Sequence, residues 1–321
     1  MNRLLSLFAS AALALGGATF LASHTAVAAD SAPTTTIKPL KVLLVTGGCC
    51  HDYSRQKEIL KQGISARTPA EFTIVHEGDN KTDHKHSIYA NKDWWKGYDV
   101  VIHDECSASV KDIDFIENVL AAHKAGVPAV VLHCGMHNYR SEGFPNKTPW
   151  FEFTGLKTTG HGPQQPISLT IVDKESPITQ GQPEWTTINE ELYNNVAGGV
   201  EATAKPLIKG KQTITDKKTN EKKDVETIVA WTNDYKGTKV FATTVGHNND
   251  TVADARYLNL VTRGLLWSVG KLDDKHFKAS DQNVDVKAIK VEPKPDAKKA
   301  SASAVRPGIE ILKDVPCCGN E

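Results

Sequence analysis

The chain has 321 residues, and its 38 lysines and arginines balance its 38 aspartates and glutamates. A neutral total charge gives no electrostatic basis for binding nucleic acid or a membrane surface. At ~100–200 residues per domain, the length suits one large domain or two small ones once a targeting segment is removed.

The first 29 residues are typical of a secretory signal peptide. Arg3 gives a positive start, an apolar run follows from Leu4 to Leu21, and residues 26–29 supply the small side chains of a cleavage site. Residues 30–39 form a polar leader. No later stretch reaches the ~20 apolar residues that span a bilayer, so we expect a periplasmic or secreted protein with no membrane span in its mature part.

Residues 40–272 are expected to form one α/β domain. Apolar runs typical of buried strands lie at residues 41–46, 72–75, 100–103 and 127–133. Helical spacing of apolar residues appears between them, at 54–66 and 113–123. This alternation predicts a parallel sheet covered by helices on both faces.

The middle of the domain departs from that pattern. Short strands are expected at 167–172, 185–188 and 227–231, separated by polar turns that include the charged segment 213–223. A buried strand at 240–244 and a helix at 257–269 close the domain. From residue 273 to 321 the chain becomes rich in Lys, Ala and Pro, which predicts a flexible tail.

Polar residues follow several of the predicted strands. In parallel α/β sheets, ligands gather outside the carboxyl ends of the strands, where the loops converge. Imidazoles stand at four such ends, namely His51, His103, His133 and His247. Their convergence is a stronger indication of a site than any one of them.

Seven segments in chain order resemble the ThuA-like (trehalose utilisation) family. They are residues 47–53 (GGCCHDY), 126–133 (GVPAVVLH), 177–181 (PITQG), 189–193 (NEELY), 229–231 (VAW), 239–247 (KVFATTVGH) and 263–267 (RGLLW). The resemblance implies a class I glutamine amidotransferase-like fold, a flavodoxin-like three-layer α/β/α sandwich with a mostly parallel central sheet. It also implies a carbohydrate substrate, either a glycoside or an oxidised 3-keto sugar.

The first functional hypothesis is a carbohydrate-processing enzyme whose candidate catalytic residues are His51, Asp52, His133, Glu191 and His247. Substrate-binding candidates are Asp104, His137, Tyr139, His161 and Trp231, and candidate metal ligands are His133, His161 and His247. Neutral imidazoles with a carboxylate suit zinc or a similar divalent ion. The same groups without a metal suit general acid–base catalysis, so the cofactor stays open. Glu191 is preferred to Glu190 because it matches the acidic position of the family's Asp-Glu-Leu-Tyr motif.

Two other hypotheses remain open. Cys134 follows a central strand, as the nucleophile of class I amidotransferases does, and His247 resembles their base. The residue two positions after His247 is Asn249, so the orienting carboxylate of that arrangement is missing. The third hypothesis is a sugar-binding protein without catalysis. An ordinary glycosidase is disfavoured because the sequence shows no clear pair of carboxylates.

Further side chains have plain structural interpretations. Asp52 is placed to cap a helix, His123 is expected on a helix surface, and His86 is expected in a solvated loop. The vicinal pairs Cys49-Cys50 and Cys317-Cys318 leave three possibilities open: a bridge, a soft metal site, or thiols. A tail of roughly 40 residues would let the second pair reach the first.

Overall fold

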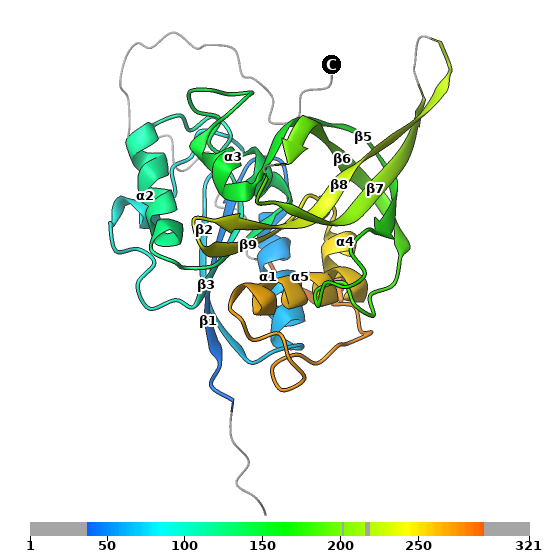
Figure 1. Ribbon diagram of the computed structural model, residues 1–321. Coiled ribbons are helices and arrows are strands. Elements are labelled where there is room, and N and C mark those ends of the chain that lie inside the picture. Colours follow the sequence, from blue (N-terminus) through cyan, green and yellow to red (C-terminus); the bar gives the residue numbers. More distant parts are fainter. Residues whose placement is uncertain (1–36, 201, 216–218, 292–321) are drawn as a thin grey trace, which may run out of the picture. The chain divides into compact units, whose positions relative to one another are not determined.

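The central feature is a nine-stranded mixed sheet in the order β2-β1-β3-β4-β9-β8-β7-β5-β6 (Figure 1). The computed structural model describes residues 37–200, 202–215 and 219–291. The strands are β1 (Leu40–Gly48), β2 (Ala70–Glu77), β3 (Val100–Cys106), β4 (Ala129–Leu132), β5 (Leu156–Ile171), β6 (Trp185–Val200), β7 (Lys205–Thr215), β8 (Lys222–Tyr235) and β9 (Thr238–Thr243). The pairings among β2, β1, β3, β4 and β9 are parallel, and those among β9, β8, β7, β5 and β6 are antiparallel. The predicted mostly parallel sheet therefore describes only one half.

Helices cover both faces of the parallel half. They are α1 (Tyr53–Ser65), α2 (Ile113–Lys124), α3 (Pro149–Thr154), α4 (Asn249–Ala253) and α5 (Ala255–Ser268), with 3-10 turns η1 (Ser87–Ala90), η2 (His133–His137) and η3 (Val286–Ala288). Alternate β1 residues point to opposite faces, so Val42 and Leu44 join α1 and α5 in one core, whereas Leu43 and Val45 join α2 and α3 in another. These two cores explain why the strand is apolar throughout.

Side-chain caps set where the helices begin. Asp52, Asp112 and Asp254 each accept hydrogen bonds from backbone N–H groups in the first turn of α1, α2 and α5. Thr148 does the same for α3, whose first residue is proline. A cap satisfies backbone donors that have no partner inside the helix. The loops leading from the strands into the helices are thereby fixed at the edge where the site lies.

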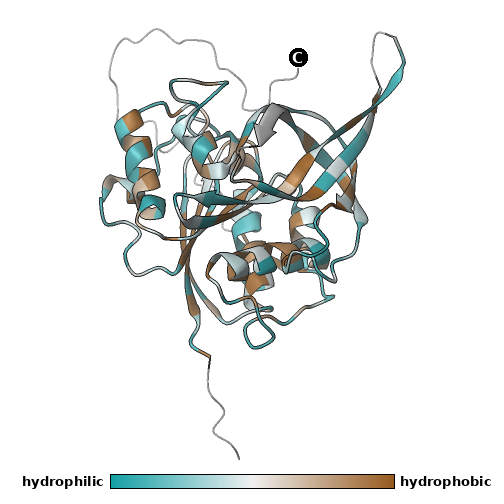
Figure 2. Ribbon diagram, viewed as in Figure 1, coloured by the Kyte–Doolittle hydropathy of each residue, from teal (hydrophilic) through white to brown (hydrophobic). Residues whose placement is uncertain are grey.

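The antiparallel half has longer strands than the sequence pattern indicates. β5 and β6 each run for 16 residues, and their pairing contains several register shifts. β7 and β8 form a long hairpin that projects from the sheet and is largely hydrophilic toward its tip (Figure 2). Exposed ion pairs such as Lys211–Asp224, at 2.6 Å, line this hairpin.

The predicted boundary at Leu272 does not coincide with the end of the packed chain. Beyond it, Phe277 and Val284 pack against the core under α5, and the Arg67 guanidinium donates to the carbonyls of Ser280 and Gln282. The predicted signal peptide, most of the predicted leader and the tail from residue 292, including Cys317-Cys318, lie outside the described residues. Among the helices of the described ranges, we find none with the length and apolar character needed to cross a membrane.

Candidate active site

Three imidazoles from three separate strand ends meet at one edge of the sheet. His51 follows β1, His133 follows β4, and His247 follows β9. Their ring centroids lie 4.7 Å (His51–His133), 4.7 Å (His51–His247) and 5.5 Å (His133–His247) apart. One nitrogen from each ring lies within 4.8 Å of the other two. The structure brings together three of the four imidazoles expected to converge, whereas the fourth, His103, contacts Glu105 and His123 instead.

The backbone at His133 is what directs its ring into the site. β4 ends at Leu132, and His133 takes a φ of 39°, in the left-handed region that non-glycine residues seldom adopt. Its Nδ1 lies 2.6 Å from the carbonyl oxygen of Thr244 on the neighbouring loop. Because a carbonyl only accepts, Nδ1 carries a hydrogen, and Nε2 faces the cluster.

Two residues of the antiparallel half complete this group. The Glu191 carboxylate, on β6, lies 3.0 Å from His247 Nδ1 and 3.4 Å from His133 Nε2. His161, on β5, places its Nε2 3.6 Å from the same carboxylate. The side chain of His247 is 16% exposed, whereas those of His133 and Glu191 are 3% and 2% exposed. We name His51, His133, His161, Glu191 and His247 the strand-end cluster.

Several ring nitrogens of this cluster face the Glu191 carboxylate. His161 Nδ1 donates to the Gly162 carbonyl at 2.7 Å, so its Nε2 is the nitrogen that faces the cluster. Nε2 of His133 and Nε2 of His161 both face Glu191 Oε2, at 3.4 and 3.6 Å. Several imidazole nitrogens therefore gather around one buried carboxylate. Imidazole nitrogens with a carboxylate are a donor set that fits zinc or a similar ion.

His51 strengthens that assignment. Within the described part of the chain, neither of its ring nitrogens has a hydrogen-bond partner, although both are shielded from solvent. A buried polar atom without a partner costs about 1–3 kcal/mol, so such atoms in a native fold call for an explanation. Burial, reinforced by the neighbouring His133 and His247, holds the pKa of His51 well below its ordinary value. His51 is thus neutral, as a metal ligand must be.

The His247 loop is held in place by residues that sequence reasoning missed. The Gln164 amide donates to His247 Nε2 at 2.9 Å, which leaves His247 Nδ1–H directed at Glu191 Oε1. The fully buried Glu190 carboxylate accepts backbone N–H groups from residues 246–248, at 3.3, 2.9 and 3.0 Å. Glu190 thus positions the loop, while its neighbour Glu191 enters the cluster.

Burial and the surrounding imidazoles shift the pKa of Glu191 in opposite directions. Burial alone would raise its pKa, but the contacts from His133 and His247 outweigh that effect and hold the pKa well below its ordinary value. Glu191 is therefore ionised at neutral pH. A carboxylate surrounded by three imidazoles is a negative centre that attracts a cation.

The sequence profile of the ThuA family, described as trehalose utilisation, matches residues 41–268. This chain belongs to the ThuA family. Solved structures of similar fold include a ThuA-like protein from Parabacteroides merdae, with 20% identity and a TM-score of 0.58 over 78% of this chain and 98% of that chain. A ThuA-like protein from Bacteroides uniformis aligns with 14% identity and a TM-score of 0.53 over 77% and 98%. At such low identity these likenesses describe the fold alone.

Weaker matches add nothing to this assignment. A glutamine amidotransferase from Thermotoga maritima aligns with 8% identity over 73% of this chain and 84% of that chain, but its TM-score is 0.38 and we draw nothing from it. No curated protein matches the chain.

Among the predicted substrate-binding residues of this ThuA family member, His137 lies beside the cluster. It is fully buried, and its ring stacks on Tyr193 with centroids 4.2 Å apart. The Tyr193 ring also contacts His133 at 4.9 Å and His161 at 5.9 Å. Tyr193, which sequence reasoning did not single out as a site residue, therefore links three of the imidazoles.

The other candidates have their described contacts elsewhere. Asp104 accepts a hydrogen bond from the Thr46 hydroxyl at 2.8 Å, and Tyr139 donates to Glu105 at 3.2 Å in the α2-side core. Trp231 is buried, and its indole donates to the Thr154 carbonyl at 2.7 Å. Asp52 caps α1 and accepts from Asn249 at 2.9 Å, which ties the β1 loop to the β9 loop.

Two expectations about other histidines are wrong. His123 is fully buried rather than on a helix surface, because β3 supplies His103 as a partner for its ring at 3.0 Å. His86 is buried rather than solvated, and its Nε2 lies 3.1 Å from the Thr46 carbonyl. In both cases the partner comes from a strand distant in sequence.

The nucleophile hypothesis for Cys134 finds no support in the geometry. The left-handed residue after β4 is His133, so the imidazole rather than the thiol occupies the strained turn. Cys134 is buried with its sulfur 2.7 Å from that of Cys106, and His247 directs Nδ1 at Glu191. Nucleophile, base and orienting acid are not assembled around Cys134 among the described contacts.

Proposed function

We propose that this ThuA family member is an exported enzyme that processes a glycoside or an oxidised 3-keto sugar at the strand-end cluster. One observation carries the proposal: His51, His133 and His247 come from separate strand ends and place nitrogens within 4.8 Å of one another, and the ionised Glu191 carboxylate lies against two of them. We further propose that His51, His133 and His247 hold one divalent ion, zinc or similar, and that Gln164 gives up its hydrogen bond to His247 Nε2 when the ion binds. Such an ion, when bound, polarises a sugar carbonyl or a water molecule.

The residues around these ligands have separable roles. Glu191 lies against three of the imidazoles and orients them, as acidic neighbours of metal-ligating histidines commonly do. The backbone carbonyls of Thr244 and Gly162 fix which nitrogen of His133 and His161 carries the hydrogen. His247 is the most exposed of the three imidazoles paired with Glu191, so a substrate would approach the cluster from the His247 side.

Carbonyl chemistry suits this arrangement better than ordinary glycoside hydrolysis. A glycosidase needs two carboxylates on either side of the scissile bond, about 5–9.5 Å apart. Of the two adjacent glutamates on β6, only Glu191 faces the imidazoles, whereas Glu190 is engaged by backbone N–H groups. The family description, trehalose utilisation, supports a sugar as the substrate class.

The first experiment measures metal in the protein. The chain from residue 30 would be produced, purified without chelator and analysed by plasma mass spectrometry. We expect about one equivalent of a divalent metal, reduced about tenfold or more in His51→Ala and His247→Ala. His276→Ala is the matched control, because His276 is bonded to Asp273 outside the cluster. No metal in the unmodified protein would refute the metal assignment.

The second experiment tests the reaction. Trehalose and 3-keto-trehalose would be incubated with the protein before and after chelation, and products followed by chromatography. Turnover lost on chelation and in His247→Ala supports the proposal. Sugar binding without product would indicate a binding protein instead. Activity that resists chelation but disappears in Cys134→Ser would indicate a cysteine-dependent hydrolase.

A further inference from the structure

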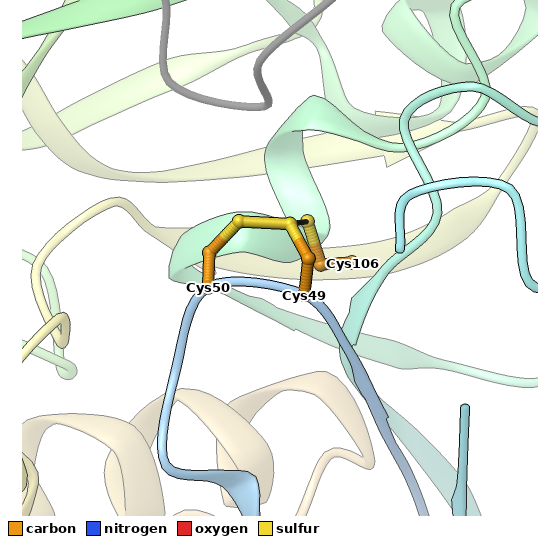
Figure 3. A group of neighbouring side chains, drawn as sticks. All are labelled: Cys49, Cys50 and Cys106. Atoms are coloured by element: carbon orange, nitrogen blue, oxygen red, sulfur yellow. Dashed lines mark hydrogen bonds between the residues drawn. A yellow bond between two sulfur atoms is a disulfide. The ribbon is translucent and has the colours of Figure 1, made fainter. Parts of the chain in front are cut away.

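Four cysteine sulfurs lie in a row beside the strand-end cluster. Cys49 and Cys50 form a disulfide, and the Cys106 sulfur lies 3.6 Å from that of Cys49 (Figure 3). The Cys134 sulfur lies 2.7 Å beyond, next to Cys106. The order is therefore Cys50, Cys49, Cys106, Cys134, and each sulfur contacts the next.

Close backbone packing at the ends of adjacent strands produces this row. Gly48 pairs with Cys106 in the sheet register, and a Cβ at Gly48 would come within 2.3 Å of the Cys106 carbonyl oxygen. A Cβ at Gly135, directly after Cys134, would come within 2.7 Å of the carbonyl oxygen of His103. Only glycine permits such approaches, so the three loops bring their sulfurs together.

Solvent reaches only one end of the row. Cys49, Cys106 and Cys134 are buried in a small apolar cluster with Tyr53 and Ala108, whereas Cys50 is exposed. A reagent in solution must therefore react at Cys50. Inside the row, electrons can move only by exchange between neighbouring sulfurs.

We propose that Cys50, Cys49, Cys106 and Cys134 form a thiol–disulfide exchange site. The Cys106 sulfur, as thiolate, attacks the Cys49 sulfur; the Cys49–Cys106 bond forms, the Cys49–Cys50 bond breaks, and Cys50 leaves as a thiolate that takes up the proton given up by Cys106. The Cys134 sulfur then attacks Cys106 in the same way and releases Cys49. Each step exchanges one disulfide for another, so no oxidant or reductant is consumed.

The exchange moves a disulfide from the exposed pair to the buried pair. The separations support it, because 3.6 Å and 2.7 Å lie within a small side-chain movement of the ~2.05 Å disulfide bond. A small dithiol, or a protein that carries one, is the class of reagent that reduces the exposed pair at Cys50. Oxidation of the pair by a disulfide of the same class reverses that reaction.

Exchange at this place also affects the strand-end cluster. Cys50 directly precedes His51, and Cys134 directly follows His133. Moving the disulfide therefore changes the covalent restraint on two loops that carry imidazoles. This consequence for activity rests on the proposed function, whereas the exchange chemistry does not.

Peptide mapping tests the exchange directly, because trypsin separates the positions. Cys49 and Cys50 fall in peptide 42–55, Cys106 in 97–111, Cys134 in 125–140, and the terminal pair in 314–321. The protein would be equilibrated in buffers of reduced and oxidised dithiothreitol, alkylated and digested at mildly acidic pH to prevent scrambling. In the unmodified protein we expect cross-links 42–55/97–111 and 97–111/125–140 in addition to the bridge within 42–55.

Two variants make the result specific. Cys106→Ser should abolish both cross-links and keep the bridge within 42–55, and Cys134→Ser should keep only the 42–55/97–111 cross-link. Circular dichroism would confirm that both variants fold, and the unmodified protein provides the test should either fail to fold. A bridge confined to 42–55 at every buffer ratio, or a dominant 42–55/314–321 cross-link, would overturn the proposal.

A zinc titration tests the alternative that the four cysteines bind a metal ion instead of exchanging a disulfide. The fully reduced protein would be titrated with zinc while its thiols are followed by alkylation. Protection of all four thiols by one zinc ion would make the row a soft-metal site and refute the exchange. Alkylation that zinc does not slow agrees with the exchange site. None of these readouts involves a sugar, so failure here is distinguishable from failure of the proposed enzyme activity.

Discussion

Two groups of histidines and carboxylates in this molecule use the same residue types in opposite ways. The first is the strand-end cluster; the second, which we name the core network, consists of the buried residues Tyr89, His103, Glu105, His123 and Tyr139. In the core network donors meet acceptors, since Glu105 accepts from His103 Nδ1 at 2.9 Å and from the Tyr89 hydroxyl at 3.0 Å. In the strand-end cluster, by contrast, neither ring nitrogen of His51 has a hydrogen-bond partner among the described residues.

The protonation states of the core network follow from its hydrogen bonds. His123 Nδ1 donates to the Val127 carbonyl at 2.7 Å, so its Nε2 accepts from His103 Nε2 at 3.0 Å. Burial lowers the pKa of His123 to about 3, which keeps it neutral. His103 Nδ1 lies 2.9 Å from Glu105 Oε1, and this contact lowers the pKa of Glu105 despite its burial.

The difference between the two groups shows how buried polar residues that support the fold can be told from buried polar residues that form a functional site. In the core network the ring nitrogens and hydroxyls are all engaged, and among the described residues only the second carboxylate oxygen of Glu105, Oε2, lacks a hydrogen-bond partner. In the strand-end cluster both ring nitrogens of His51 lack one. Buried histidines alone therefore do not mark a site, but a buried imidazole without any hydrogen-bond partner, beside other imidazoles, indicates one.

The largest effect is expected when the core network is broken. Glu105→Gln removes the charge that pairs with His103 and should lower the free energy of unfolding by about 3–5 kcal/mol, measured by urea denaturation. Glu226→Gln is the control, because Glu226 pairs with Lys209 on the surface and should cost less than ~1 kcal/mol. Equal losses in both variants would show that the core network is not a structural unit.

A pH-dependent effect of about 3 kcal/mol is expected at Asp104, on the opposite face of β3 from Glu105. Burial raises the pKa of Asp104 to about 8, above its ordinary value in the unfolded chain, so the folded state retains a proton that the unfolded state has released. The contribution of Asp104 to the free energy of unfolding therefore falls as the pH rises from the unfolded-state pKa to the folded-state pKa. From pH 5 to pH 7, at ~1.4 kcal/mol per pH unit, the unmodified protein should lose about 3 kcal/mol relative to Asp104→Asn.

Urea unfolding of both proteins at the two pH values gives that difference directly. Other titrating groups cancel because they are common to both proteins. Parallel pH dependence in the two proteins would mean that Asp104 is ionised in the fold, and the carboxylate would then need a cationic partner.

The sequence predicts the parallel half of the fold and the imidazoles that it positions. Continuous apolar strands fix which residues follow them, and parallel strands place those residues at one edge, so His51, His133 and His247 could be found from the pattern. His161 and Glu191 were also candidates, but only through fold-level convergence and family resemblance.

The antiparallel half is where sequence reasoning misses residues. β5 and β6 pair with register shifts around His161, and such shifts leave no periodic pattern to follow. Gln164, Glu190 and Tyr193 lie on these two strands, and none was identified as a site residue. His123 was wrongly predicted to lie on a helix surface for a related reason. Its helical spacing fits a buried face, but its partner His103 is brought to it by tertiary packing, which the local sequence does not reveal.

A smaller loss is expected at Glu190, which connects the two halves. Glu190→Gln keeps the size of the side chain but removes a carboxylate that accepts three backbone N–H groups, and should cost about 1–3 kcal/mol in urea unfolding. Because the loop carries His247, metal affinity should fall as well. Glu184→Gln is the control, since Glu184 accepts one N–H on an exposed part of the sheet. Unchanged metal affinity despite lost stability would show that Glu190 does not position His247.

The smallest effect is expected for a histidine of the strand-end cluster. His51→Ala removes no hydrogen bond described for the ring, so the free energy of unfolding should change by less than ~1 kcal/mol while metal binding is lost. His123→Ala, the matched change in the core network, removes bonds to His103 and Val127 and a stack on Phe153, and should cost about 2–4 kcal/mol. If metal-free His51→Ala is as destabilised as His123→Ala, the strand-end cluster is a second structural core. A stable His51→Ala that no longer binds metal would instead show that this histidine is retained for chemistry, because the fold does not need it.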